Sequence, residues 1–182
     1  MNVKSKVAVV TLMAMSLASI NVMAATAGNS GKVTFTGEVV DSPCNLAPGQ
    51  DGTDVKVDFG QLSMAQLNAG EKAFEPFVIK LENCALTTTT PEGVTTTKTA
   101  EITFNSTDVD GTNTALLKPN GSASGLGIGI NGYTFGTAAP LNGLVDGNND
   151  LRFTATAQQL VAGTPVTAGD FMASTNFVIA YQ

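Results

Sequence analysis

The chain of 182 residues carries 15 acidic and 9 basic side chains, has a net charge of −6 at pH 7, and contains no histidine. An acidic surface does not favour phosphate backbones, so the charge argues against a nucleic-acid partner. The lack of histidine removes the side chain that most often acts as a general base near neutral pH, which weakens any enzymatic interpretation.

The first segment has the pattern of a cleaved secretory leader. Lys4 and Lys6 form a short basic start, residues 7–20 form an uncharged apolar run, and small residues lead to Ala24. This pattern predicts a signal peptide at residues 1–24 that is cut after Ala24. The apolar run is shorter than the roughly 20 residues that span a bilayer. We therefore expect an exported mature chain without a membrane span and with room for one domain.

Both cysteines, Cys44 and Cys84, lie in the part of the chain that is expected to be exported. In an oxidising compartment an even and minimal count favours one structural disulfide. The alternative is a metal or redox pair, but the sequence has neither a CxxC motif nor a histidine to complete such a site. The sequence therefore predicts a disulfide between Cys44 and Cys84.

Short runs of alternating apolar residues recur along the mature chain, and turn-forming residues separate them. Period-two alternation is typical of half-buried strands, and seven or more such strands predict an all-β fold, an antiparallel β-sandwich. Only residues 64–67, with Ser63 as a cap, predict a helical turn. The alternating runs lie at residues 32–40, 55–59, 77–81, 102–104, 126–130, 151–155 and 169–182.

A glycine-rich motif at residues 127–132 matches the GxGxxG pattern of dinucleotide-binding loops. That pattern binds a pyrophosphate only where a strand ends and a helix begins. Here the pair Asn131-Gly132 is followed by another alternating run at residues 133–135. The context therefore predicts a hairpin with a tight turn, not a cofactor site.

Two other segments have both a functional and a structural interpretation. Asp108 and Asp110 resemble a fragment of a calcium loop, but the remaining ligands of that loop are absent, so a solvated turn is favoured. The threonine-rich stretch at residues 87–99 is compatible with a glycosylated stalk, but it is short and flanked by strands, which favours a surface hairpin or loop. We find no assembled catalytic set and expect no enzyme, no metal site and no cofactor.

The C-terminal run ends the chain, so no following hairpin can pair with it. Its apolar side is formed by alternate residues, among them Gly169, Phe171, Phe177, Ile179 and Tyr181. Either an earlier strand of the chain covers the free edge of this strand, or another protein does.

At the other end of the mature chain, residues 25–36 form an arm of small and polar residues that runs into an alternating strand. Gly31, Val33 and Phe35 share one side of this strand. An arm without a sheet and a strand without a neighbour are complementary, because an exposed edge can take up a strand from another chain. The alternative is that the arm folds back as the first strand of a complete, monomeric sandwich.

The same segments resemble chaperone–usher pilins and are similar to the major rod subunits of P pili and type 1 fimbriae. The resemblance covers essentially the whole mature chain. It rests on GKVTFTGEVVDSPC at residues 31–44, VDFGQLS at 57–63, LENC at 81–84, LVDGNNDLRFTA at 144–155, Gly169 as the fourteenth residue from the end, and the penultimate Tyr181.

The resemblance implies an incomplete immunoglobulin-like β-sandwich at residues 37–182, which lacks its seventh strand. The acceptor groove would lie beside the C-terminal strand, from Gly169 through Phe171, Phe177 and Ile179 to Tyr181. The donor strand would come from the arm at residues 25–36 of a neighbouring subunit, with Gly31 at a point of close contact because it has no side chain. Its facing residues would be Asn29, Gly31, Val33 and Phe35.

The family also implies partners and a location. A periplasmic pilus chaperone would fill the groove first, and the arm of the next identical or related subunit would replace it at the outer-membrane usher. We therefore expect a structural subunit of a fimbria on the cell surface, which supports cell adhesion. The alternative is a minor pilin adaptor or single-domain adhesin at the fimbrial tip.

Overall fold

The computed structural model describes residue 29 and residues 31–182, so the expected signal peptide lies outside the described residues. The chain divides into two units, one that ends at Val39 and one from Val40 to Gln182. In the first unit, residues 31–39 are exposed and form no strand. The strand predicted at residues 32–40 is therefore wrong for the isolated chain, because no backbone partner is present to form a ladder.

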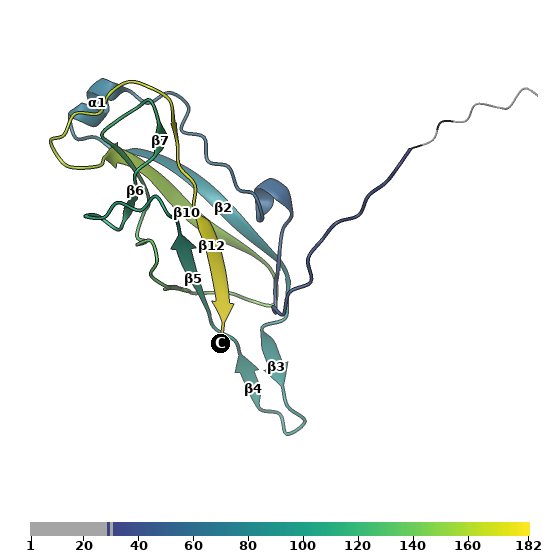
Figure 1. The fold of residues 1–182 in the computed structure, drawn as a ribbon. Helices are drawn as coiled ribbons and strands as arrows, with labels where there is room; N and C mark the ends of the chain where they lie inside the picture. The colour runs from purple at the N-terminus through teal and green to yellow at the C-terminus, as the bar shows by residue number, and fades with distance from the viewer. Residues whose placement is uncertain (1–28, 30) are drawn as a thin grey trace, which may run out of the picture. The chain divides into compact units, whose positions relative to one another are not determined.

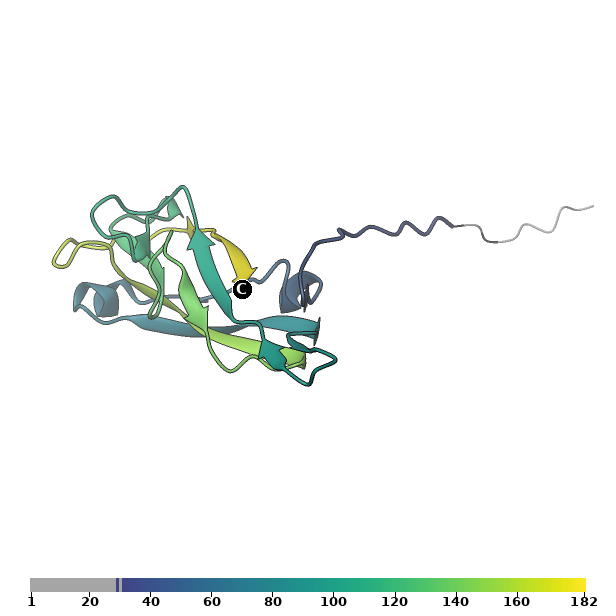
Figure 2. The same ribbon diagram turned by 90° about the horizontal axis from the view of Figure 1, so that it is seen from below.

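The second unit is an antiparallel sandwich of two main sheets, which confirms the predicted architecture (Figures 1 and 2). The larger sheet consists, in spatial order, of β1 (Asn45–Leu46), β2 (Ala73–Cys84), β10 (Gly147–Gln159), β8 (Leu126–Ile130) and β6 (Leu116–Leu117). The smaller sheet consists of β12 (Asn176–Tyr181), β5 (Ala100–Asn105) and β9 (Ala139–Leu141).

Two small strand pairs and two short helices complete the unit. The strand pairs are β11 (Phe171–Met172) with β7 (Asn120–Gly121), and β3 (Thr87–Thr89) with β4 (Thr95–Thr97). The helices are the 3-10 turn η1 (Gly49–Asp51) and α1 (Met64–Asn68). Ser63 caps α1 as predicted, since its hydroxyl accepts a hydrogen bond from the backbone N–H of Gln66.

The core lies between the two sheets. Ile79 and Leu81 of β2 and Ile102 of β5 are at most 1% exposed. Phe104 of the smaller sheet meets Phe153 of the larger sheet edge to face, with 5.4 Å between the ring centroids. Alternating residues of the strands predicted at 77–81, 102–104 and 151–155 therefore pack in one apolar core cluster, and a second, smaller core cluster contains Leu126.

The glycines of the GxGxxG motif allow close packing within the larger sheet. A Cβ on Gly127 would lie 3.0 Å from the side chain of Leu116, and one on Gly129 would lie 2.8 Å from the carbonyl oxygen of Ala115. Strand β6 therefore approaches β8 where side chains are absent. This packing gives the motif a structural explanation that involves no nucleotide.

The turn after β8 is predicted correctly, but the second strand of that hairpin is wrong. The N–H of Tyr133 donates to the carbonyl of Ile130 at 3.0 Å, which closes the turn. Residues 133–135 form no strand, and β8 pairs with β10 and β6 instead. The chain crosses here to the other sheet, where β9 pairs with β5, and Phe135 is buried in the core on the way.

A disulfide joins Cys44, just before β1, to Cys84 at the end of β2. The two cysteines are 40 residues apart. In the chain-entropy account, a loop of that length makes reduction lower the free energy of unfolding by about 4 kcal/mol. We expect thermal and denaturant unfolding of reduced protein, and of the double variant Cys44→Ser with Cys84→Ser, to show this loss. Equal stability of the oxidised and reduced forms would contradict a structural role for the bond.

Candidate functional site

Strand β12 is hydrogen-bonded along one edge only. It pairs with β5 from Asn176 opposite Asn105 to Tyr181 opposite Ala100. Within residues 31–182, no strand pairs with its other edge. One row of backbone N–H and C=O groups is therefore free to bind a further strand.

Residues 53–62 form a second wall that faces this free edge across an open groove. Val55, Val57 and Phe59 are half-buried and alternate with the exposed Lys56 and Asp58, so the predicted alternation of side chains is correct. The predicted strand at residues 55–59 is nevertheless wrong, because this segment forms no ladder with any described strand. Its extended backbone lacks a partner.

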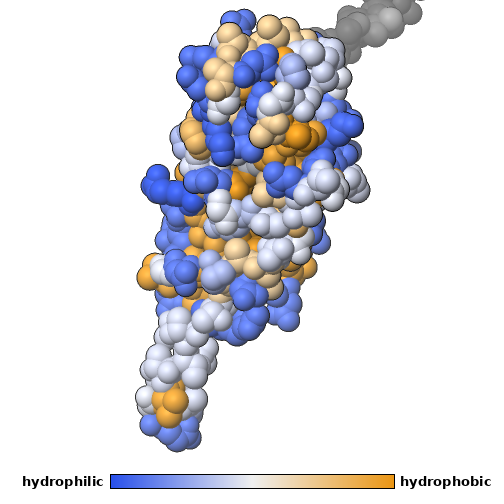
Figure 3. Space-filling model, turned by 90° about the vertical axis from the view of Figure 1, so that its left-hand side faces the viewer, coloured by the Kyte–Doolittle hydropathy of each residue, from blue (hydrophilic) through white to orange (hydrophobic). Residues whose placement is uncertain are grey.

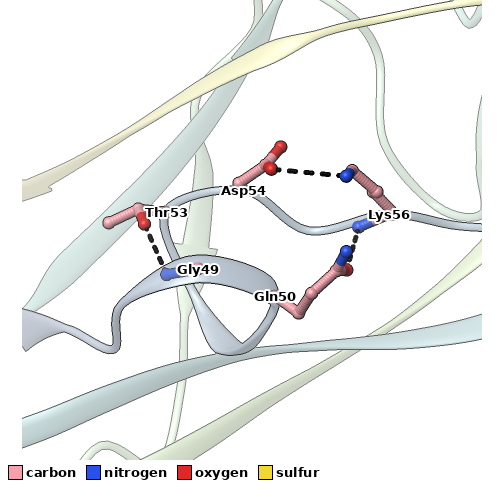
Figure 4. Close-up of polar contacts among 5 residues, drawn as sticks. All are labelled: Gly49, Gln50, Thr53, Asp54 and Lys56. Atoms are coloured by element: carbon pink, nitrogen blue, oxygen red, sulfur yellow. Dashed lines mark hydrogen bonds and ion pairs between the residues drawn. The ribbon is translucent and has the colours of Figure 1, made fainter.

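Side chains from η1 and the following loop hold the start of this wall (Figure 4). The N–H of Gly49 donates to the hydroxyl of Thr53 at 2.8 Å, and the N–H of Lys56 donates to the side-chain oxygen of Gln50 at 3.0 Å. The ammonium of Lys56 lies 3.7 Å from a carboxylate oxygen of Asp54, but both side chains are exposed and the pair adds little. These local bonds position the wall without using a neighbouring strand.

The groove between the walls has a volume of about 650 Å³. Its floor is apolar and comes from both sheets, with Phe77 and Ile79 of β2 and Phe104 of β5 among its residues. A second cavity of about 660 Å³ shares the lining residues Phe59 and Phe171 and extends the groove toward α1. The site is therefore a long trough whose floor is apolar beside β12 and mixed in character toward α1, and its rims are extended backbone.

The predicted acceptor residues fall into two groups. Phe171 and Phe177 line the groove, and Gly169 lines its extension near α1. Ile179 and Tyr181 are half-buried on the same side of β12 and pack against the core. The sequence did not assign the opposite wall, residues 55–59, to the groove, although the alternation within VDFGQLS was the signal that could have identified it.

The C-terminal run is two strands, not the single strand predicted. β11 pairs with β7, the ladder stops at residues 173–175, and β12 then pairs with β5. At the break, the hydroxyl of Thr175 donates to the carbonyl of Asn105 at 3.0 Å, and that of Ser106 donates to the carbonyl of Ser174 at 2.8 Å. The predicted alternation of side chains is correct from Phe171 to Tyr181, because the odd-numbered residues are half-buried and the even-numbered ones are exposed.

Gly169 is required by a close approach of two backbones. A Cβ at this position would lie 2.4 Å from the backbone nitrogen of Ala123 and 2.6 Å from the carbonyl carbon of Ser122. Both segments are fixed there, because the N–H of Ser122 and that of Ala123 donate to the carbonyl of Asp170 at 3.0 and 3.1 Å. Any larger residue would force the start of the C-terminal wall away from its neighbour.

Tyr181 closes the other end of this wall. Burial raises the pKa of its phenol above the ordinary value, while the hydroxyl of Ser42 acts in the opposite direction. The phenol therefore stays neutral at physiological pH and presents an apolar ring to the core. The contact also places the end of β12 next to the point where the chain enters the domain.

Asp110, which resembles a residue of a calcium loop in its sequence context, lies in a turn. One carboxylate oxygen of Asp110 accepts hydrogen bonds from the N–H and hydroxyl of Thr112 and the N–H of Asn113, at 3.0, 2.6 and 2.7 Å. These bonds lower the pKa of Asp110 and hold residues 110–113 in the conformation of a turn. In the part of the chain that the structure describes, no three potential metal ligands come together and no helix is long and apolar enough to cross a membrane.

The sequence model of the fimbrial protein family matches residues 33–182. The chain is 39% identical to a Fimbria A protein of Serratia marcescens over 98% of each chain. It is 35% identical to a Pap fimbrial major pilin protein of Escherichia coli over 84% of each chain. Among solved structures, it is similar to the subunit of a chaperone–usher pilus studied for rod uncoiling, with 33% identity, a TM-score of 0.69, and coverage of 85% of this chain and 96% of that chain.

Proposed function

The chain belongs to the fimbrial protein family, and from this premise we propose that it polymerises as the structural subunit of a surface fimbria by exchanging strands between neighbours. Its fold is the incomplete immunoglobulin-like sandwich of pilins. The observation that carries the proposal is the apolar groove with free backbone on both rims. A small molecule could cover the floor, but only an extended chain could also bind both rims.

The N-terminal arm has the pattern that this groove requires. Val33 and Phe35 are 74% and 90% exposed and share one side of the chain with Gly31 and Asn29. Burial of the two apolar side chains in a neighbour contributes roughly 1.5–3 kcal/mol each. Each backbone hydrogen bond to a rim adds about 1 kcal/mol net. Residues 25–36 are therefore assigned as the donor strand.

The direction of insertion follows from where the chain enters and leaves the domain. The N–H groups of Thr99 and Gln182 donate to each other's carbonyls, and the N–H of Ala85 donates to the carbonyl of Pro43. The entry of the chain at Val40–Pro43 and the end of β12 are thus at one end of the domain, which also carries the β3–β4 hairpin (Figure 1). If the arm lay parallel to β12, the donor subunit would be placed at the end of the acceptor from which the acceptor's own arm leaves. We therefore assign the antiparallel direction, which leads to an open head-to-tail polymer.

The proposal includes the route of export. Before assembly, the groove would expose apolar surface in the periplasm, so a chaperone that lends a strand is needed to prevent aggregation. An outer-membrane usher would then bring subunits together for the exchange. The signal peptide at residues 1–24 and the domain at residues 37–182 are parts of the same proposal.

The names of the relatives favour a shaft subunit over a tip adaptor, since one of them is called a major pilin. Electron microscopy of cells with and without this chain tests the proposal, with antibody labelling of the fibres. We expect fibres only in its presence and label along their whole length. Unchanged fibres without the chain would refute the structural role, and label confined to the tips would favour an adaptor.

A further inference from the structure

The β3–β4 hairpin projects from the domain without packing against it (Figures 1 and 3). Every residue from Thr87 to Thr99 is exposed. The hairpin is held by its own ladder, by the turn bond from the N–H of Thr90 to the carbonyl of Val94 at 2.9 Å, and by a contact between the hydroxyls of Thr89 and Thr95 at 3.1 Å. A two-stranded hairpin with no buried face is marginally stable in water, so a packing partner would stabilise it considerably.

The root of the hairpin is fixed, in contrast to its tip. One carboxylate oxygen of Asp146 accepts hydrogen bonds from the N–H groups of Leu86 and Thr87, at 2.6 and 3.0 Å. These bonds lower the pKa of Asp146, so its carboxylate is charged and holds the backbone at the start of the hairpin in place. The N–H of Lys98 closes the base by donating to the carbonyl of Leu86 at 2.9 Å. The direction in which the hairpin leaves the domain is therefore set by the domain.

The hairpin and the arm start from the same place. The Cys44–Cys84 bond and the hydrogen bond from Ala85 to Pro43 join the entry of the chain to the segment just before the hairpin, which begins at Thr87. If Phe35 is the last donor residue, residues 36–43 can span at most about 29 Å. The seven residues from Ala85 to the turn at Pro91 span about 23 Å as a strand. The two lengths are similar, so a subunit that binds the arm can lie within reach of the hairpin.

We propose that the β3–β4 hairpin forms a second contact between neighbouring subunits and lies against the α1 end of the subunit that has bound this subunit's arm. The inference rests on the proposed strand exchange and on its antiparallel direction, which brings the α1 end of the acceptor toward the donor. The partner of the hairpin is thus a second copy of this chain, and the contact lies next to the proposed interface between arm and groove.

Both surfaces carry exposed apolar side chains. Val94, next to the hairpin turn, is 59% exposed. At the α1 end, Met64 is 46% exposed and Val161 is 53% exposed. These two lie at the same end of the domain because α1 precedes β2, and the start of β2 pairs with β10 close to the loop that contains Val161. Single exposed apolar residues are common on protein surfaces, but these lie where the polymer geometry brings two copies together.

Photo-cross-linking in intact fibres tests this contact. The full chain is produced with p-benzoylphenylalanine in place of Val94, assembled and irradiated, and the linked peptides are identified by mass spectrometry. We expect subunit dimers joined to residues 60–68 or 160–166 of the neighbour. The same probe at Val178, which is 58% exposed on β12, is the matched control and should not give these pairs. Dimers that map elsewhere, links to a protein other than the subunit, or no links in intact fibres would overturn the proposal.

A shortened hairpin separates this contact from strand exchange. Replacing residues 88–96 by Asn-Gly joins Thr87 to Thr97, which already pair, through a two-residue turn. We expect this variant to form fibres, because its arm and groove are intact, but with at least a two-fold lower median length after shearing. Fibres as robust as those of the wild type would refute the hairpin contact and leave strand exchange standing. A loss of polymer on deletion of the arm tests strand exchange itself.

Discussion

Deletion of residues 25–34 should abolish polymer formation and leave a subunit that still folds around its chaperone. The deletion removes Gly31 and Val33 from the donor strand and leaves the described domain from Val40 onward unchanged. The shortened chain keeps its groove, so it can accept a strand but cannot donate one. Electron microscopy and gel analysis of periplasmic complexes measure the two functions separately. Normal fibres from this variant would refute the donor assignment.

Two matched point variants test which side of the arm is buried in the neighbouring subunit. Phe35→Asp puts a charge on the side of the arm that we expect to be buried, whereas Thr34→Asp puts the same charge on the opposite side. The first change removes roughly 1.5–3 kcal/mol of apolar burial and adds the cost of burying a carboxylate, so the affinity between subunits should fall by about 100-fold or more. The second should leave polymerisation close to normal. Equal effects of the two charges would contradict the alternation on which the donor register depends.

The sequence identified the faces of the strands better than their partners. Alternation is a local property, so the buried side of residues 171–181 was correct even across the break in pairing at residues 173–175, whereas Gly169, predicted on the same side, is exposed. Pairing is not local, and residues 133–135 alternate without forming a strand because the chain crosses there between the sheets. The boundaries of a strand depend on which neighbour is present, and a short pattern does not contain that information.

Two of the three segments whose strand prediction is wrong are also the two that the proposed strand exchange involves. Residues 32–40 and 55–59 alternate as strands do, but neither forms a ladder in the described chain. One belongs to the arm and the other to a wall of the groove. Their side chains have the alternation of a half-buried strand, while their backbones lack the partner that a second subunit would supply. In these two segments, the disagreement between the local pattern and the fold of the single chain is therefore informative about assembly.

The second large effect is expected in the groove. Val57 lines both parts of the trough but belongs to neither core cluster, so Val57→Asp should place a charge in the groove without unfolding the sandwich. A bound donor strand would bury this carboxylate without a partner, which costs several kcal/mol. We expect the variant to lose binding of a synthetic arm peptide by at least 100-fold. The control is Lys56→Ala on the exposed side of the same wall, which should bind the peptide normally.

Mixing experiments then distinguish an acceptor defect from general damage. A Val57→Asp subunit keeps its arm, so each variant subunit that the chaperone still delivers can join a growing chain, but its damaged groove cannot take the next arm. Gel analysis of periplasmic complexes measures how much of the variant is delivered. Co-expression with the wild-type chain should therefore shorten fibres in proportion to the dose of the variant. The arm-deleted subunit has the opposite defect: it can occupy only the first position of a chain and cannot stop growth after that. A variant that was merely misfolded would enter no fibres and would leave wild-type fibre length unchanged. If Val57→Asp shortens fibres in proportion to its dose and the arm deletion does not, each subunit must donate through its arm and accept through this groove.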